Sequence, residues 1–436
     1  MPVSRKRKKK SQPARRSPQR ATAPAPSRTH PSFAFGELLE HRRKLEQHRT
    51  VLAGTAAAAM IDALATSAPG QSDDDLEDDL CVRYGAAMVQ YDGGPLDDLV
   101  NPDNLAEALL SVLDERLHEA EAGADATVLQ RLLTVVAGVM PFPLSLSAHD
   151  LLVEHLGGQQ AGRVEGRRAV TGPVLWARDV YGCRRAVVAP FASTDGPDRW
   201  YLWDVDTCGY VVVTVRSGFH SSAESALAAW RESAGQSAAG QADLTPVDDA
   251  ETLGDLLRGE IEGIRTGGED QQQYAEFLRS RRLGRTAQEA VPATAGHAPA
   301  RLAAEDAEER FAQRLRRLGY AAGTIEDGER TGPVGADELA AELADSWSPR
   351  HHPALYPFCS PHKVALTVLY VRDYYQSDFA AVLVAALPEW IRFLAEETGM
   401  AAELTERCLA YASGDLEFPG TTDDDGRSTL MTPVAE

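Results

Sequence analysis

The chain has 436 residues, 43% of them hydrophobic, so it is long enough for more than one domain and too apolar to be disordered throughout. Its 65 acidic residues outnumber 44 basic ones, and a formal net charge of −21 excludes polyanion binding by the charge of the chain as a whole. The five cysteines are scattered and never form a CxxC pair, which argues against a disulfide framework or a four-cysteine zinc ribbon and favours a reducing compartment.

Residues 1–30 depart from this acidic balance, because they hold ten basic residues and no acidic one. Apolar side chains are rare there, so burial cannot offset the entropy lost on ordering, and residues 1–34 are predicted to be a disordered basic tail. Such a tail is typical of proteins that contact the phosphates of RNA or DNA without reading the bases. The side chains predicted to make these contacts are Arg5, Lys6, Arg7, Lys8, Lys9, Lys10, Arg15 and Arg16.

Two other roles stay open for the tail. It can be an unbound solubilising terminus, or it can dock on the protein's own acidic run at residues 73–79. The tail lacks the apolar segment that would complete a signal peptide, and no stretch of about 18 apolar residues follows it. We therefore expect a cytoplasmic protein that is not attached to a membrane.

Residues 35–158 are predicted to form an all-helical domain. Leu38, Leu45 and Leu52 recur at intervals of seven residues, which predicts a long amphipathic helix directly after the tail. The acidic run at residues 73–79 is predicted to be a loop or the first turn of a helix, where carboxylates favour the positive end of the helix dipole.

Residues 159–236 are predicted to form a small α+β domain. Four runs rich in aromatic and β-branched residues, separated by turn-like breaks, predict an antiparallel meander. These runs are 174–176, 185–191, 200–205 and 210–215. A helix capped by Ser221 or Ser222 follows and is expected to cover one face of the sheet. Asp204 and Asp206 are interpreted as hairpin-turn residues rather than a magnesium site, because a strand and not a helix comes next.

The end of this domain, YLWDVDTCGYVVVTVRSGFHSSAESALAAWRESAG at residues 201–235, is similar to small antitoxin-type and double-stranded-RNA-binding-like folds. In those folds a β-sheet precedes a helix that is opened by Ser and Glu. The resemblance covers about 35 residues and implies a layered architecture, without a particular activity.

The remaining residues are predicted to be helical. Residues 237–284 form a helical segment, and residues 285–302 are predicted to be a linker because Ala, Pro, Gly and Thr dominate them. An all-α C-terminal domain at 303–414 and a loose polar tail at 415–436 complete the chain. The sequence thus predicts a multidomain, mainly α fold with a small central α+β domain.

The stretch from Trp347 to Met400 resembles a helical module of uncharacterised actinobacterial cytoplasmic proteins that also carry a basic N-terminal tail. In that module a helix opened by Ser-Pro, here Ser360 and Pro361, precedes a helix with a Trp-x-Arg-Phe segment, here residues 390–393. The resemblance implies a bacterial, cytoplasmic setting and no activity.

Motifs for catalysis are scarce. The chain has no GxxxxGK[ST] phosphate-binding loop, no GxSxG nucleophile elbow and no HExxH zinc motif. Four candidate zinc ligands gather instead near the start of a predicted helix, with Cys359 and His362 at a chelating spacing. They are His351, His352, Cys359 and His362. Alternatively, Cys359 is a small core residue among aromatic neighbours.

These observations favour a noncatalytic bacterial binding or adaptor protein. Its basic tail would anchor it weakly to RNA or DNA, and another protein is a further possible partner. The alternative is a metal-dependent, hydrolase-type enzyme that uses the His/Cys cluster at residues 351–362, with zinc as its cofactor.

Overall fold

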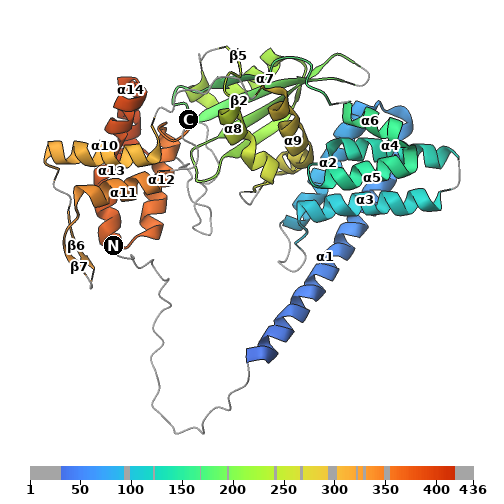
Figure 1. Cartoon of the computed structure of the whole chain (residues 1–436), viewed down its shortest axis with the longest axis horizontal. Helices are drawn as coiled ribbons and strands as arrows, with labels where there is room; N and C mark the ends of the chain where they lie inside the picture. The colour runs from blue at the N-terminus through green and yellow to red at the C-terminus, as the bar shows by residue number, and fades with distance from the viewer. Residues whose placement is uncertain are drawn as a thin grey trace, which may run out of the picture.

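The structure is a computed structural model in which three helical or α+β parts lie side by side, with the sheet in the middle (Figure 1). The predicted fold class, mainly α with a small antiparallel α+β domain, is confirmed. The described residues are 31–92, 99–120, 123–166, 168–193, 196–239, 243–265, 269–292, 302–320, 323–327, 330–347 and 354–417.

The N-terminal part is a helical bundle. Its helices are α1 (Pro31–Ser67), α2 (Asp73–Asp92), α3 (Pro102–Glu119), α4 (Ala124–Val139), α5 (Leu144–Leu156) and α6 (Gly158–Gly166), with a short 3-10 turn η1 (Ala68–Gly70) after α1. The acidic run forms the first turns of α2, one of the two predicted possibilities. Leucines at helical spacing along α3, among them Leu105, Leu109 and Leu113, form the centre of the bundle core.

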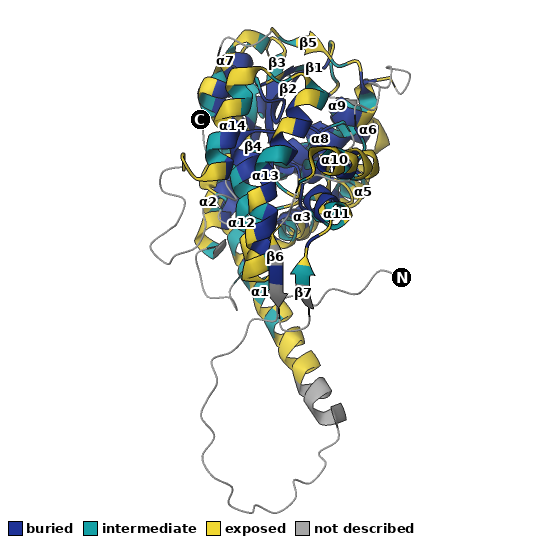
Figure 2. Ribbon diagram, turned by 90° about the vertical axis from the view of Figure 1, so that its left-hand side faces the viewer, coloured by how far each residue is buried: buried dark blue, intermediate teal, exposed yellow. Residues whose placement is uncertain are grey.

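Helix α1 changes character along its length. Residues 38–52 are exposed or half-buried, whereas Ala53, Ala57 and Ile61 are buried in the bundle core. The first half of α1 therefore projects from the body of the protein, as Figures 1 and 2 show.

By length and composition, Leu38–Gly70 is long and apolar enough to cross a membrane, with a mean hydropathy of 1.5 over its best window. The sequence-based expectation that no such stretch exists was wrong, because alanines rather than large apolar residues supply the hydropathy. A third of that window is buried in the protein, and the core helix of a bundle meets the same criteria.

The central sheet has five antiparallel strands in the order β4-β3-β2-β1-β5. The strands are β1 (Leu175–Arg178), β2 (Arg184–Phe191), β3 (Arg199–Asp206), β4 (Val213–His220) and β5 (Thr245–Pro246). The last strand of the predicted meander was placed too early, since β4 begins at Val213 and continues through Gly218 and Phe219. The β3–β4 register shifts between Asp204 and Val205, where β4 contains one extra residue, Val215, as in a β-bulge.

Helices cover both faces of this sheet. On one face, α7 (Ala223–Ala234) packs Trp230 against Leu202, and it is capped by Ser222, whose side chain accepts a hydrogen bond from Ser225 N. The 3-10 turn η3 (Gly235–Ala238) follows α7. On the other face, α8 (Ala250–Glu262) and α9 (Gln271–Ala290) pack against Trp203. The segment expected to be a separate helical stretch thus covers the second sheet face.

Residues of helix α9 pack into two different hydrophobic cores. Leu283 packs with the sheet, while Tyr274 and Leu278 lie in the core of the N-terminal bundle. The contact between α9 and α2 is close enough to require a glycine, because a Cβ on Gly85 would lie 2.8 Å from the backbone nitrogen of Ala275. The bundle and the sheet are therefore joined by a shared helix.

The linker was predicted to begin too early. Helix α9 continues to Ala290, and Ala287 within it is buried against the sheet, so residues 285–290 are helical. The small residues that suggested a linker there are used for close packing. Residues 293–301, the rest of that prediction, lie outside the described residues.

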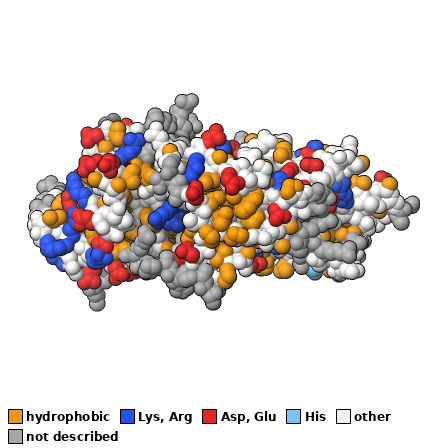
Figure 3. Space-filling view, turned by 90° about the horizontal axis from the view of Figure 1, so that it is seen from above, with side chains coloured by type: hydrophobic (Ala, Val, Ile, Leu, Met, Phe, Trp, Pro, Cys, Tyr) orange, Lys and Arg blue, Asp and Glu red, His pale blue; other side chains and the backbone are white. Residues whose placement is uncertain are grey.

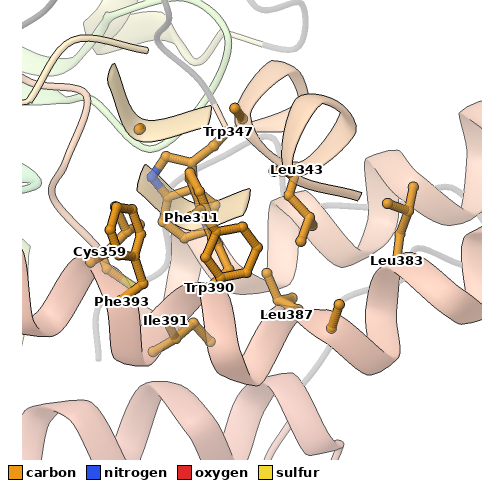
Figure 4. Packing of buried hydrophobic residues seen from close by; sticks show 14 of the residues in the cluster. Phe311, Leu343, Trp347, Cys359, Leu383, Leu387, Trp390, Ile391 and Phe393 are labelled. Carbon is orange, nitrogen blue, oxygen red and sulfur yellow. The ribbon is translucent and has the colours of Figure 1, made fainter. Parts of the chain in front are cut away.

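The C-terminal part contains helices and a small hairpin. Its elements are α10 (Ala304–Leu318), β6 (Thr324–Asp327), β7 (Arg330–Pro333), α11 (Ala336–Ser346), α12 (Pro361–Tyr374), α13 (Ser377–Thr398) and α14 (Ala402–Ser413). The all-α prediction missed the β6–β7 pair. The core is aromatic, with Phe311 in edge contact with Trp390 at 4.9 Å between ring centroids, and Trp347 and Phe393 beside them (Figure 4).

One buried carboxyl makes stability depend on pH. Burial raises the pKa of Glu260, near the end of α8, to about 7. The folded protein therefore holds a proton that the unfolded chain releases at lower pH, so this group's stabilising contribution is complete below about pH 4.5 and is lost as pH rises towards 7. We expect Glu260→Gln, which stays neutral, to lose less stability than the wild type between pH 5 and pH 8. Thermal melts at both values test this, and identical losses would contradict it.

Candidate functional site

The basic tail attaches to the projecting end of α1. The predicted phosphate-contacting residues, Arg5 to Arg16, lie outside the described residues. The first described side chains of α1 continue the basic character, with Arg42, Arg43 and Lys44 all exposed. Arg42 forms an ion pair with Glu46 at 3.6 Å, and Lys44 one with Glu40 at 3.5 Å, both one helical turn apart. The start of α1 thus carries exposed charges on a stretch of helix that extends from the bundle (Figure 1).

The acidic run on α2 has basic partners inside the protein. Arg131 on α4 pairs with Asp73 at 2.6 Å and also donates to the carbonyl oxygens of Ala68 and Gln71. Arg83 pairs with Asp79 within α2 itself. Further ion pairs connect the run to the segment before β1, to β3 and to α9: Arg168–Asp74, Arg168–Glu77, Arg199–Asp78, Arg279–Glu77 and Arg279–Asp78. These carboxylates neutralise arginines of the body, so they are poor acceptors for the tail.

The described surface of the body offers mixed charges. Figure 3 shows one face of the molecule, on which basic and acidic side chains are interspersed around exposed apolar ones. Several of the acidic side chains pair with neighbouring arginines, as in Arg314–Glu396 and Arg392–Glu389 in the C-terminal part. Such a surface supplies no extended positive field for a polyanion.

The four residues of the sequence-based metal cluster are not brought to one point among the described residues. His351 and His352 lie outside the described residues. Cys359 is fully buried in the aromatic C-terminal core, the alternative interpretation of this residue. His362, in the first turn of α12, instead faces the sheet, where its Nδ1 lies 3.6 Å from Oδ2 of Asp206.

A buried polar cluster joins the sheet to α12, and no local sequence pattern indicates it. Asp206, Cys208 and His362 each offer a ligand atom, and these atoms all lie within 4.8 Å of one another. The Cys208 thiol is also 3.2 Å from Ser360 Oγ, across 152 residues of sequence. Only the tertiary fold brings these segments together, so residue spacing cannot reveal the cluster.

Local structure places each member of the cluster. Asp206 is the last residue of β3, and its Oδ1 accepts a hydrogen bond of 2.8 Å from the Cys208 backbone nitrogen. Ser360 is the N-cap of α12 and accepts from the backbone nitrogen of Lys363 at 3.1 Å, which sets the first turn carrying His362. The Ser-Pro signal at Ser360 and Pro361 therefore marks this helix start correctly.

A tight turn before β2 completes the cluster. Asp179 Oδ1 accepts hydrogen bonds from the backbone nitrogens of Cys183 at 2.9 Å and Arg184 at 3.1 Å. Gly182 in this turn has a φ of 74°, a backbone conformation that favours glycine. The ring of Phe358 packs against Gly182 so closely that a Cβ would collide with it. The turn is thereby held against the segment that leads into α12.

The aspartates of β3 have different roles from the one predicted. Asp204 lies inside the strand, fully buried, and forms a two-pronged ion pair with Arg184, at 2.9 Å and 2.8 Å. The turn interpretation was wrong for Asp204, because the strand continues for two more residues. Asp206 does help to form the turn after β3, but it is buried as well.

Burial is the largest influence on the pKa values of the cluster residues. It raises the pKa of Asp179 to about 7 and raises the pKa values of the Cys183 and Cys208 thiols. Burial opposes ionisation of Asp206 too, but hydrogen bonding and charge from His362, with Arg184 nearby, hold the pKa of that carboxyl below its usual value.

The cavity at the cluster is small. Its volume is about 30 Å³, and the lining includes Asp179, Cys183, Asp206, Cys208 and His362. A water molecule or a single ion needs roughly 10–15 Å³ of such space, so either fits, whereas an organic substrate does not. The arrangement suits binding of a small species rather than turnover of a substrate.

A second group of possible ligands lies on the bundle surface. Asp114 and His118 on α3 meet His155 on α5, with 2.8 Å between His155 Nε2 and Asp114 Oδ1. His118 is 56% exposed and also contacts Glu154 at 3.2 Å. These groups already satisfy one another as hydrogen-bonded and ionic pairs in contact with water.

Comparison of the chain with protein family models, with curated proteins and with solved structures gives no match. The resemblances of residues 201–235 and 347–400 thus gain no support from these comparisons. The projecting α1 and the buried cluster are therefore the features of the structure that bear on function.

Proposed function

We propose that the protein is a noncatalytic binding or adaptor protein of the bacterial cytoplasm, anchored to RNA or DNA by its basic N-terminal tail. The observation that carries this proposal is the projection of α1, whose residues 38–48 extend from the bundle at the end of the helix that follows the tail in sequence. Ten positive charges without an acidic neighbour form a strong local field at that end of the chain.

Internal ion pairing supports this role over docking of the tail on the body. The acidic run at residues 73–79 was the natural internal partner for the tail. Four of its carboxylates pair with Arg131, Arg168, Arg199 or Arg279 of the body itself. Replacing these partly or fully buried partners with a solvated tail would leave arginines uncompensated, at a cost that an exposed tail contact does not offset.

The metal-dependent hydrolase alternative is less well supported. The cavity at the His362 cluster has a volume of only about 30 Å³, and its possible ligands are buried. A catalytic zinc site needs an open coordination position that a substrate can reach. A cavity of this size suits a bound ion better than a substrate.

Deleting residues 2–28 is expected to abolish nucleic-acid binding while leaving the melting temperature almost unchanged, because the tail carries the positive charge and precedes every described core residue. Binding of the full chain to a labelled 30-nucleotide duplex should weaken steeply with salt. With five phosphate contacts, affinity falls roughly 500-fold between 50 mM and 200 mM salt, at about −0.9 per contact in log-log slope.

Two variants of the tail distinguish the effect of its charge from the effect of its length. Changing residues 5–10 and 15–16 to Gln keeps the tail length and should lose binding, whereas a scrambled tail of the same composition should keep it. Absence of binding by the full chain at low salt, or equal binding by the Gln variant, would make the tail a solubilising segment.

A further inference from the structure

We propose that Cys183, Asp206, Cys208 and His362 bind a zinc ion that fastens the central sheet to helix α12. This structural site goes beyond the nucleic-acid anchoring proposed above and does not depend on it. Neither the spacing of these residues nor any other local pattern assigns it.

The donor atoms are close to the separations that zinc requires. Zinc bonds to sulfur, nitrogen and oxygen are about 2.0–2.3 Å long, so the ligand atoms of a tetrahedral site are roughly 3.3–3.8 Å apart. His362 Nδ1 and Asp206 Oδ2 are already 3.6 Å apart, and Cys208 Sγ completes a group within 4.8 Å. Small side-chain rotations suffice to bring the three atoms onto one ion.

Cys183 supplies the fourth ligand. It lies in the turn before β2, opposite the end of β3, and the carbonyl oxygen of Cys183 accepts hydrogen bonds from the backbone nitrogen and hydroxyl of Thr207. It lines the same small cavity as Asp206, Cys208 and His362, although its Sγ is outside the group of ligand atoms that lie within 4.8 Å of one another. Two thiols, an imidazole and a carboxylate from four buried positions make a closed set of four protein ligands, which is the composition of a structural zinc site.

Hydrogen bonds around the ligands would hold them in place. Ser360 Oγ, 3.2 Å from Cys208 Sγ, can donate to the thiolate, and the backbone nitrogen of Cys208 already donates to Asp206 Oδ1. The remaining oxygen of Asp206 faces His362 and is the one positioned for the metal. Such outer contacts set ligand orientation and affinity.

The two sulfur ligands determine which metal ion the site prefers. Thiolates favour zinc over calcium and magnesium, which take oxygen ligands. The surface group of Asp114, His118 and His155 has no sulfur and is exposed to water, so it is the weaker competitor for zinc.

The experiment is metal analysis of the full chain after purification, reloading with zinc and removal of loose ions. One zinc per chain is expected, and a chelator should lower the melting temperature. Cys208→Ser and His362→Gln should lose the ion, while Ser360→Ala should weaken binding about 10–100-fold. Cobalt substitution in the unmodified chain should give a thiolate-to-metal charge-transfer band, which keeps the test valid if a variant does not fold.

Two matched variants act as controls. Cys359→Ala removes a neighbouring buried cysteine outside the cluster, and His155→Gln alters the surface group, so both should retain zinc. Loss of zinc from either control with retention in Cys208→Ser would overturn the proposal. So would absence of zinc from the reloaded protein, or a disulfide between Cys183 and Cys208 in its place.

Discussion

Replacing Arg279 with alanine is expected to lower the free energy of unfolding by about 3–5 kcal/mol, because it leaves the buried Glu276 without its arginine and removes one of the two arginines that pair with Glu77 and with Asp78. The Arg279 side chain is 5% exposed, and its Nε donates to Glu276 at 2.9 Å. The same guanidinium pairs with Glu77 and Asp78 of the acidic run. One residue on α9 thus neutralises charges from both α9 and α2.

Chemical denaturation followed by circular dichroism measures this loss. The control is Arg258→Ala, which breaks the ion pair with Asp255 at 3.1 Å but alters a side chain that is 54% exposed. Its effect is expected to stay within about 1 kcal/mol, since exposed ion pairs contribute little. Similar losses for the two variants would show that the carboxylates around Arg279 are compensated in another way.

Trp390→Ala is expected to cost about 3–5 kcal/mol through the cavity it opens in the C-terminal core. Trp390 is fully buried and meets Phe311 at 4.9 Å and Phe393 at 5.5 Å between ring centroids. Few other residues can fill the space, because the surrounding side chains are themselves large and rigid (Figure 4). Trp390→Phe keeps most of the contact and should cost less.

The buried cysteines can show which part of the protein loses stability in this variant. Cys183 and Cys208 pack in the same cluster as Trp390, whereas Cys81 lies in the core of the N-terminal bundle. In metal-free Trp390→Ala, a thiol reagent should therefore label Cys183 and Cys208 at lower denaturant concentration than Cys81. Simultaneous labelling of all three would mean that the whole chain unfolds as one unit.

Local sequence patterns predicted those parts of the fold that depend on near neighbours. Strand β2 is predicted from its run of β-branched and small residues, and α7 from the serines before it, since both signals act within a few residues. The hairpin of β6 and β7 was missed because its four-residue strands, TIED and RTGP, show little alternation of apolar and polar residues.

The candidate site depends on contacts between residues far apart in the chain, which local patterns do not predict. Cys359-x-x-His362 has a plausible ligand spacing, yet the first residue faces the aromatic core and the second faces the sheet. The start of α12 turns the two side chains apart, and the partners of His362 come from the end of β3. A ligand set made by tertiary packing leaves no periodic or spacing signal in a single sequence.

The shared helix α9 also affects the order of folding during synthesis. Arg279 follows Glu77 by 202 residues, so ribosomes that add about 5–20 residues per second expose α2 for roughly 10–40 s before its partner appears. During that time the bundle lacks Tyr274 and Leu278, and Glu77 and Asp78 of α2 lack one of their two arginine partners. Nascent chains of this length should therefore be protease-sensitive around α2, and they should gain protection only when residues 271–290 have left the ribosome.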